Sequence, residues 1–284
     1  MIEIISSILD GLLIGLVYGL ASIGLTLIFG VMDVVNLAHG AVIALGMFSL
    51  YIFFGAGLNP YISLLPIIII GFLFGVLIYQ IAVRQIINGP SLMTLLATFA
   101  VSMIIIGIGT AVWSTSPYNV NIQSKTLDIL GYTVTSSRLV AAFAAVLVTF
   151  LLYYFLYKTR LGKAIRAVSN NREAAELMGI PSRQILAISF GIGTSLAMLS
   201  GALISTMFPF TILSGGVYEL KSFVASVLGG LGNPTGALFG GIVLGLIEGS
   251  VAPFIAISWT NVIEFAMFVL ILLFFPKGML GRRK

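Results

Sequence analysis

The sequence contains no cysteine and a single histidine, His39, among 284 residues. Without cysteine the chain can form neither a disulfide nor a thiolate metal site. A lone histidine without a second His or a Cys makes a metal centre improbable, so we predict no metal ion and no cofactor. No nucleophile, base and orienting group occur together in a recognisable pattern. We therefore predict no catalytic residues and a protein that is not an enzyme.

The sequence also lacks a phosphate-binding loop. The nearest match to G-x-x-x-x-G-K-[ST] is Gly162-Lys163, which lacks both the first glycine and the hydroxyl residue. The polar stretches are too short to fold into a separate ligand-binding domain. Any use of ATP and any high-affinity capture of a ligand must therefore come from other chains.

Charged residues are also scarce. Only 8% of the residues are charged, against about 25% in typical soluble domains, while 59% are hydrophobic and the mean hydropathy is +1.15. Apolar runs of about 20 residues, the length of a helix that crosses a bilayer, fill the chain. The opening MIEIISSILD has no Lys or Arg, so we expect the first run to be a permanent span rather than a signal peptide. The composition predicts an all-α integral membrane protein.

Apolar runs bounded by polar residues define the expected spans. The last third is less regular, because its first segment is short and interrupted by glycine. We expect a polytopic bundle of eight or nine transmembrane helices, nine if that segment crosses fully. Aromatic residues suited to a membrane interface lie near several span ends, namely Trp113, Tyr118, Tyr153, Tyr154, Tyr157 and Trp259. The expected spans lie near residues 8–30, 35–56, 61–83, 92–113, 138–157, 185–208, 217–232, 234–252 and 259–275.

Basic residues indicate the orientation in the membrane. The net charge of +5 comes largely from two places, the loop at 158–184 and the C-terminal Lys277, Arg282, Arg283 and Lys284. The positive-inside rule puts both in the cytoplasm and the N-terminus outside. This distribution explains the charge by topology, so we predict contact with membrane lipid and none with nucleic acid, and location in the cell membrane.

Two glycine-containing segments resemble each other and form a weak internal repeat. Residues 30–46 read GVMDVVNLAHGAVIALG, and residues 228–245 read LGGLGNPTGALFGGIVLG. Discontinuous helices of this kind hold polar ligands near the midplane in many transporters. Alternatively, each segment is a simple turn that starts a helix. The residues that we expect along a translocation path are Asn36, His39, Gly40, Asn233 and Gly236.

Acidic residues also occur inside apolar runs. Glu248 and Glu264 must face a partner or water, because an ionised carboxylate at the bilayer centre costs at least about 2.5 kcal/mol. We include Glu248 in the candidate translocation path, with a position near the end of a span as the alternative. Glu219 and Lys221 stand close enough in sequence to pair with each other.

The polar loop at 159–183 predicts two short helices outside the bilayer. Helix-forming patches cover residues 162–168 and 172–178, and Asn170 or Asn171 can cap the second. Ala174, Leu177 and Met178 recur at helical spacing, and Gly179 is a plausible helix stop.

At this loop the chain resembles the permeases of ABC importers. Glu173-Ala174-Ala175, followed after three residues by Gly179, is similar to their EAA-type motif, which forms a coupling helix. LTLIFGVMDVVNLAHG, RLGKAIRAVSNNREAAELMGI, VLGGLGNPTGALFGGIVLG and FPKGMLG together resemble LivH-type branched-chain amino acid permeases between residues 11 and 281. Asp33 and Ala41 depart from the family pattern, which leaves the substrate open.

The resemblance implies one permease domain over residues 1–284, with the cytoplasmic coupling loop at 158–184 inside it. It implies import of branched-chain or related small amino acids by alternating access. The implied partners are cytoplasmic ATP-binding subunits, a second homologous permease and an extracytoplasmic substrate-binding protein. The residues that it assigns to coupling with the ATPase are Arg166, Arg172, Glu173, Ala174, Ala175 and Gly179.

Two alternatives stay open at this point. An ion-coupled secondary transporter would bind H⁺ or Na⁺ at Asp33, Glu248 or Glu264 near the broken helices. An ABC permease for urea or short amides would share the motifs and differ in substrate.

Overall fold

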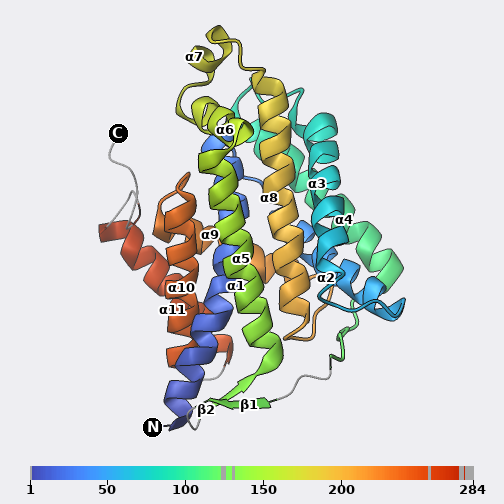
Figure 1. Ribbon diagram of the computed structural model, residues 1–284, viewed down its shortest axis with the longest axis vertical. Helices are drawn as coiled ribbons and strands as arrows, with labels where there is room; N and C mark the ends of the chain where they lie inside the picture. The colour runs from blue at the N-terminus through green and yellow to red at the C-terminus, as the bar shows by residue number, and fades with distance from the viewer. Residues whose placement is uncertain (1, 123–125, 130–131, 255–256, 275–277, 279–284) are drawn as a thin grey trace.

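The structure is a computed structural model that describes residues 2–122, 126–129, 132–254, 257–274 and 278. It is almost entirely helical, which confirms the predicted all-α class (Figure 1). One turn of π-helix, η1 (Tyr79–Val83), extends α3, and the described strands β1 (Thr126–Ile129) and β2 (Tyr132–Thr135) form an antiparallel hairpin. The α-helices are α1 (Ile2–Met32), α2 (His39–Gly55), α3 (Leu64–Ile78), α4 (Ser91–Trp113), α5 (Ser136–Lys158), α6 (Arg160–Asn170), α7 (Arg172–Leu177), α8 (Ser182–Ser205), α9 (Ser214–Gly229), α10 (Pro234–Val251) and α11 (Ile257–Phe274).

Six helices among the described residues are long and apolar enough to cross a membrane, namely α1, α3 with η1, α4, α5, α8 and α10. Helices α2 and α9 have 17 and 16 residues. At 1.5 Å per residue they are about 24–26 Å long, shorter than the hydrocarbon core of roughly 30 Å. The chain is thus a multi-pass membrane protein, and the expected eight or nine crossings are not confirmed.

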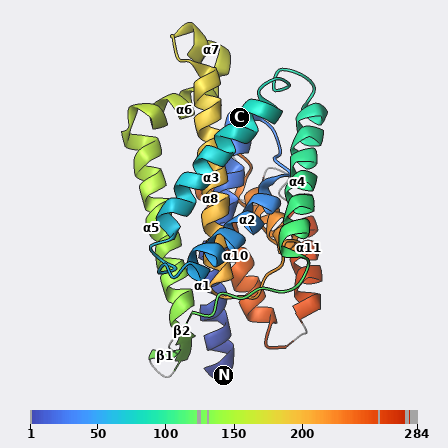
Figure 2. The ribbon, with the colours of Figure 1, turned by 90° about the vertical axis from the view of Figure 1, so that its right-hand side faces the viewer.

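Helices α1 and α8 form the centre of the bundle. Helix α8 packs on α2 and α3 on one side and on α1 on the other, while α1 also packs on α10, α9 and α5 (Figures 1 and 2). Nearly all of α8 is buried, including its serine and threonine side chains. After Ser182, at its first position, their hydroxyls donate to carbonyls three or four residues back on the same helix. These bonds within the helix satisfy the hydroxyl groups, so a helix with several serine and threonine residues can lie in the water-free core.

The most extensive helix contact joins α1 to α10 through glycine. Gly11, Gly15 and Gly19 recur every fourth residue on α1, and Gly241, Gly245 and Gly249 do the same on α10. Residues four apart share one helix face, so each helix presents a smooth strip of backbone to the other. A Cβ atom built on Gly241 would lie 2.2 Å from the backbone nitrogen of Gly19. Membrane helices associate through such small-residue faces because lipid gives them no hydrophobic drive.

Large apolar side chains cover the outer helices. On α3, α4 and α5, residues such as Leu73, Ile104 and Phe143 expose 60% or more of their surface. In water such faces would aggregate, whereas lipid chains solvate them. The exposed faces therefore mark the lipid-facing side of the bundle.

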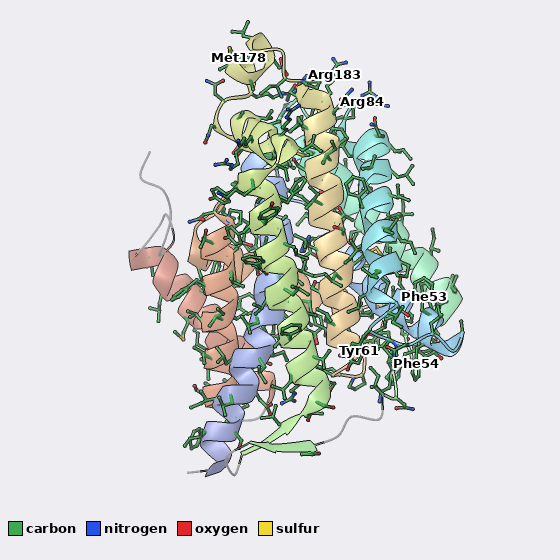
Figure 3. The ribbon with its side chains drawn as sticks, viewed as in Figure 1. Phe53, Phe54, Tyr61, Arg84, Met178 and Arg183 are labelled. Atoms are coloured by element: carbon green, nitrogen blue, oxygen red, sulfur yellow. The ribbon has the colours of Figure 1, made fainter. Side chains whose placement is uncertain are left out.

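A cluster of aromatic side chains lies toward the end of the bundle opposite α7. The Phe48 ring stacks on Trp113 with centroids 4.4 Å apart, and Phe210 and Tyr118 meet it edge-on. Trp113 and Tyr118 thus pack against other aromatic side chains and stay partly exposed, so their interfacial position remains a prediction. Figure 3 shows Phe53, Phe54 and Tyr61 at this same end, far from Met178.

Helix α1 begins at the end opposite α7, as the predicted topology requires (Figure 1). An ion pair between Asp10 and Arg138 joins α1 to the start of α5 there. The basic C-terminal residues Lys277, Arg282, Arg283 and Lys284 lie outside the described residues, so the orientation of the C-terminus stays a prediction.

A substitution can test the glycine contact. We expect Gly241→Val to lower the thermal midpoint of the detergent-purified protein by several degrees, because overpacking costs about 1–3 kcal/mol and backbone atoms have no room to move. Gly107→Val is the matched control, since no atom lies within 4 Å of a Cβ built there. Equal midpoints for the two variants, measured by thermal-shift size exclusion, would contradict this account.

Candidate functional site

The polar loop folds into the two predicted helices, α6 and α7, which project from one end of the bundle (Figures 1 and 2). Thr159 caps α6, because its Oγ1 accepts a hydrogen bond of 3.0 Å from the Gly162 N–H. Gly162, Ile165 and Val168 form the buried face of α6. A Cβ on Gly162 would lie 2.1 Å from the Phe155 carbonyl oxygen, so glycine lets α6 turn sharply off the end of α5.

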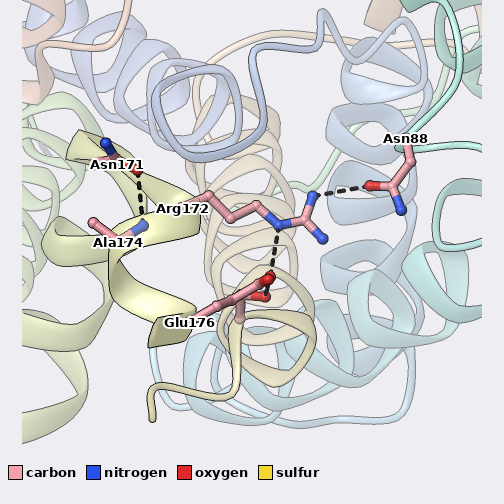
Figure 4. Close-up of polar contacts among 6 residues, drawn as sticks. Asn88, Asn171, Arg172, Ala174 and Glu176 are labelled. Atoms are coloured by element: carbon pink, nitrogen blue, oxygen red, sulfur yellow. Dashed lines mark hydrogen bonds and ion pairs between the residues drawn. The ribbon is translucent and has the colours of Figure 1, made fainter. Parts of the chain in front are cut away.

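Helix α7 is bounded by the residues that the sequence suggested. Of the two candidate caps, Asn171 is the one used, and its Oδ1 accepts from the Ala174 N–H at 2.9 Å (Figure 4). Glu173 lies in the first turn, where a carboxylate is favoured by the helix dipole. Gly179 ends the helix with φ of +80°, a conformation that glycine adopts without strain.

Arg172 and Glu176 connect α7 to two other parts of the bundle. Its Nη1 donates to Asn88 Oδ1, in the connection between α3 and α4, at 3.2 Å, and its Nε donates to Glu176 at the same distance (Figure 4). Ser182, the first residue of α8, donates its hydroxyl to the Glu176 carboxylate. The hydrogen bond from Ser182, followed by that from Arg172, holds the pKa of Glu176 below its ordinary value.

The tip of α7 has an apolar surface that no described part of the chain covers. Leu177 and Met178 expose 89% and 83% of their surfaces. Figure 3 shows Met178 at the far end of the molecule, with Arg183 and Arg84 on the same end. Because this end also carries the polar loop, lipid cannot cover these side chains as it covers those of α3 to α5.

The predicted coupling residues divide into two groups. Glu173, Ala174 and Gly179 are exposed on or beside α7, and Ala175 is buried beneath it. Arg166 lies on α6, where its Nε donates to the Leu156 carbonyl at 3.1 Å and its guanidinium covers the Tyr157 ring. Arg166 is thus turned toward α5 instead of the exposed tip, and Arg172 has partners within the chain.

The first glycine-containing segment includes the connection between α1 and α2, where the helical path of the chain is interrupted inside the bundle. Between α1 and α2 the backbone leaves helical geometry, and Asp33 has a φ of +54°. Asn36 Oδ1 accepts from the Ala38 N–H at 3.1 Å, and the Leu37 N–H donates to Thr98 of α4. Asn36 therefore stabilises a turn inside the protein and does not cap α2 through its side chain.

His39 begins α2 and is completely buried. Its Nε2 lies 3.0 Å from the Ala21 carbonyl oxygen of α1, and its Nδ1 has no hydrogen-bond partner. Gly40 lies against Gly215 and Glu219 of α9, and a Cβ there would be 2.6 Å from Glu219 Oε2. The Glu219 carboxyl and the Gly40 backbone are hydrogen bonded, which places an acidic group at the N-terminus of α2.

The second segment starts α10 at a different level of the bundle. Pro234 occupies the first turn, and Asn233 precedes it without capping the helix through its side chain. Gly236 packs on Gly229 of α9 so closely that a Cβ would lie 1.9 Å from the Gly229 carbonyl oxygen. Asn233 lines a pocket with Gly30 near the end of α1, whereas His39 contacts Ala21, nine residues earlier on that helix.

Glu248 faces a cation, as its position in an apolar run required. Lys221 Nζ lies 2.6 Å from Glu248 Oε2 and 4.8 Å from the centroid of the Tyr18 ring. The sequence interpretation that paired Lys221 with Glu219 was wrong, because α10 brings Glu248 to the lysine, while the Glu219 carboxylate lies against Gly40 of α2. Sequence reasoning did not identify Lys221 as the partner of Glu248, nor Tyr18 as a residue of this site. The signal that could have found Lys221 is a lysine inside a short apolar segment. The side chain of Glu264 lies outside the described residues.

The candidate path residues thus occupy three places, the break before α2, the start of α10 and the ion pair between α9 and α10. Among the described residues no group of three or more His, Cys, Asp or Glu side chains could hold a metal ion.

The chain matches the family model described as "Branched-chain amino acid transport system / permease component" over residues 7–272. The chain belongs to this family. It is 29% identical to the high-affinity branched-chain amino acid permease BraD of Pseudomonas aeruginosa, with 98% of this chain and 96% of BraD covered. It is 27% identical to LivH of Escherichia coli, covering 96% and 94%, and 29% identical to a probable LivH of Methanocaldococcus jannaschii, covering 92% and 88%.

No solved structure matches the chain. Membership in the family confirms the predicted permease subunit of an ABC importer, a transport protein and not an enzyme.

The buried ion pair gives a first test at this site. We expect Lys221→Met and Glu248→Leu to lower the thermal midpoint of the permease by roughly 5–10 °C each, because an unpaired buried charge costs about 3–5 kcal/mol. The double variant should recover most of the loss, since both charges are then gone. Additive losses in thermal-shift measurements would show that the two side chains are not coupled.

The carboxylate of Glu176 gives a second test. Because its pKa is lowered in the folded loop, the attachment of α7 is strengthened above the ordinary pKa of a glutamate and is lost as the pH falls through the lowered value. Protection factors for hydrogen exchange over residues 172–180, which correct for the slower intrinsic exchange in acid, should therefore be high near pH 7 and fall in acid. We expect Glu176→Gln to lower the protection factors at pH 7 and to remove their pH dependence. An unchanged acid response in that variant would contradict the assignment.

Proposed function

We propose that this permease carries branched-chain or related small amino acids into the cell by alternating access, driven by ATP hydrolysis in other subunits. The partners are two cytoplasmic ATP-binding subunits, a second homologous permease and an extracytoplasmic substrate-binding protein. The observation that carries the proposal is the apolar tip of α7, with Leu177 and Met178 uncovered at an end of the molecule that lipid does not reach.

A short helix with small residues fits a groove on a protein partner. Glu173, Ala174 and Gly179 are exposed around the tip and offer little side-chain bulk beyond the carboxylate. Leu177 and Met178 supply the apolar contact, which is worth roughly 1.5–3 kcal/mol per side chain when it is fully buried. The ATP-binding subunit is the partner whose movement must reach the membrane, so we assign this surface to it.

The contacts of Arg172 and Glu176 supply a route from α7 into the bundle. Arg172 joins α7 to Asn88 between α3 and α4, and Glu176 joins it to Ser182 at the start of α8. Since α8 is the central helix, a displacement of α7 is transmitted to the core by a rigid element.

The broken segments supply candidates for the substrate path. Asn36, His39 and Gly40 lie where the backbone leaves helical geometry, and their polar groups are closed off from solvent in this conformation. Alternating access requires such groups to be covered in one state and open in another. Asn233 directly precedes α10, and Gly236 and Glu248 lie on it, so a movement of α10 would carry all three.

A reconstitution experiment separates the proposal from an ion-coupled carrier. The chain is co-expressed with its candidate ATP-binding subunit and second permease, purified through a tag on this chain alone, and placed in proteoliposomes. We expect leucine uptake that requires ATP and the binding protein and that persists when the proton and sodium gradients are collapsed. Uptake that follows an ion gradient without ATP would overturn the proposal.

A pair of surface substitutions tests the role of the α7 tip. We expect Leu177→Ser combined with Met178→Ser to reduce co-purified ATP-binding subunit about tenfold or more, since the loss of two buried apolar side chains exceeds 1.4 kcal/mol. Leu58→Ser is the control, because Leu58 is 47% exposed near the opposite end of the molecule. Full co-purification by the double variant, with normal membrane insertion, would exclude α7 as the docking surface.

A further inference from the structure

A pocket of about 210 Å³ lies at the α6 end of the bundle, between α1, α5, α6 and the residues that precede α10. Holding a single water requires roughly 10–15 Å³, so the space accommodates a larger polar group. The polar residues that line it are Thr26, Tyr153, Tyr157, Arg166, Ser169, Asn170 and Asn233. No acidic side chain is among the lining residues.

The charge in this pocket is positive and held in place. Arg166 is fixed by the hydrogen bond from its Nε to the Leu156 carbonyl and by its position over the Tyr157 ring, 4.4 Å from the centroid. Its two terminal nitrogens have no hydrogen-bond partner among the described residues. A guanidinium with both terminal nitrogens available is suited to bind two oxygens of one oxyanion.

Two further groups face the same space. Thr26 is fully buried on α1, and its hydroxyl has no hydrogen-bond partner although the residue lines the pocket. Helix α10 begins at the pocket wall with Pro234 at its first position, and its side-chain cap is missing. Free backbone N–H groups at a helix N-terminus attract anions. The cation, the unpaired hydroxyl and the helix terminus therefore favour one kind of ligand.

The location of the pocket indicates the source of that ligand. The pocket wall includes Tyr157, which is 50% exposed next to Lys158, where the apolar part of α5 ends. This is the depth of lipid headgroups, and the basic residues around it place it in the cytoplasmic leaflet. Basic pockets between membrane helices on that side bind anionic lipid headgroups.

We propose that this pocket binds the phosphate group of an anionic phospholipid from the cytoplasmic leaflet. The phosphate accepts hydrogen bonds from Arg166 and Thr26 and lies near the first turn of α10. The same lipid then ties α6 to α1 and α10, reinforcing the hydrogen bond from the Ser169 hydroxyl to the Gly30 carbonyl. This site does not depend on any particular ATPase or transported substrate.

Lipid retention by the full-length purified chain tests the proposal. The chain is equilibrated with equal amounts of phosphatidylglycerol and phosphatidylcholine, and bound lipid is counted by native mass spectrometry. We expect preferential retention of phosphatidylglycerol by the wild type and about fivefold less in Arg166→Gln, the effect of one basic residue. Thr26→Val should also retain less, because it keeps the shape and loses the hydroxyl.

Arg160→Gln is the matched control, since Arg160 is exposed on the same helix and does not line the pocket. It should retain as much phosphatidylglycerol as the wild type. If Arg166→Gln fails to fold, as judged by size exclusion, Arg166→Lys together with Thr26→Val gives the answer. Equal retention by the wild type and the pocket variants overturns the proposal.

A second measurement separates a lipid from a free anion. Inorganic phosphate is titrated calorimetrically onto the chain in nanodiscs of phosphatidylcholine alone. We expect no saturable heat at millimolar phosphate, because the glycerol and acyl chains of the lipid contribute to binding. Saturable heat that disappears in Arg166→Gln, without any preference for phosphatidylglycerol, assigns the pocket to a soluble anion and overturns the lipid site.

Discussion

The backbones of α1 and α10 touch along their length because glycine recurs every fourth residue on both helices. In lipid, helices gain little by burying apolar side chains, so close backbone approach supplies the attraction between them. This contact brings the start of α10 beside the end of α1 and leaves α9 packed against both. The ion pair of Lys221 with Glu248 and the pocket around Arg166 exist because these helices are held in this arrangement.

Polar groups inside the bundle follow one physical rule. A carboxylate or lysine in a dry environment must be paired, and a hydroxyl can bond within its own helix. Lys221 and Glu248 obey the first part, and the serines and threonines of α8 obey the second. His39 Nδ1 and the Thr26 hydroxyl are buried without a partner, and each lies beside a break or a pocket. Two of the buried polar atoms without a partner thus lie where ligands and conformational change are proposed, whereas others, such as the Tyr79 and Thr149 hydroxyls, do not.

The α6–α7 loop is held to the rest of the bundle by a small set of specific contacts. Its caps, its small residues and its glycine stop define a rigid short helix, and its polar contacts tie that helix to α8 and to the α3–α4 connection. The apolar tip remains uncovered, which is unfavourable for an isolated chain. The proposed assembly with a cytoplasmic ATP-binding subunit would bury the tip of α7 and remove this cost.

Local pattern was sufficient to predict the helical class, most helix boundaries, the two loop helices with Asn170 or Asn171 as a cap and Gly179 as a stop, and the family. These features depend on composition and on neighbours within a few residues, which the sequence displays directly. The tertiary structure decided which helices are long enough to cross, that Lys221 pairs with Glu248 instead of Glu219, that Arg166 turns toward α5, and that Trp113 packs on Phe48. Each of these depends on residues far apart in the chain being brought together, and helix periodicity carries no information about which face meets which.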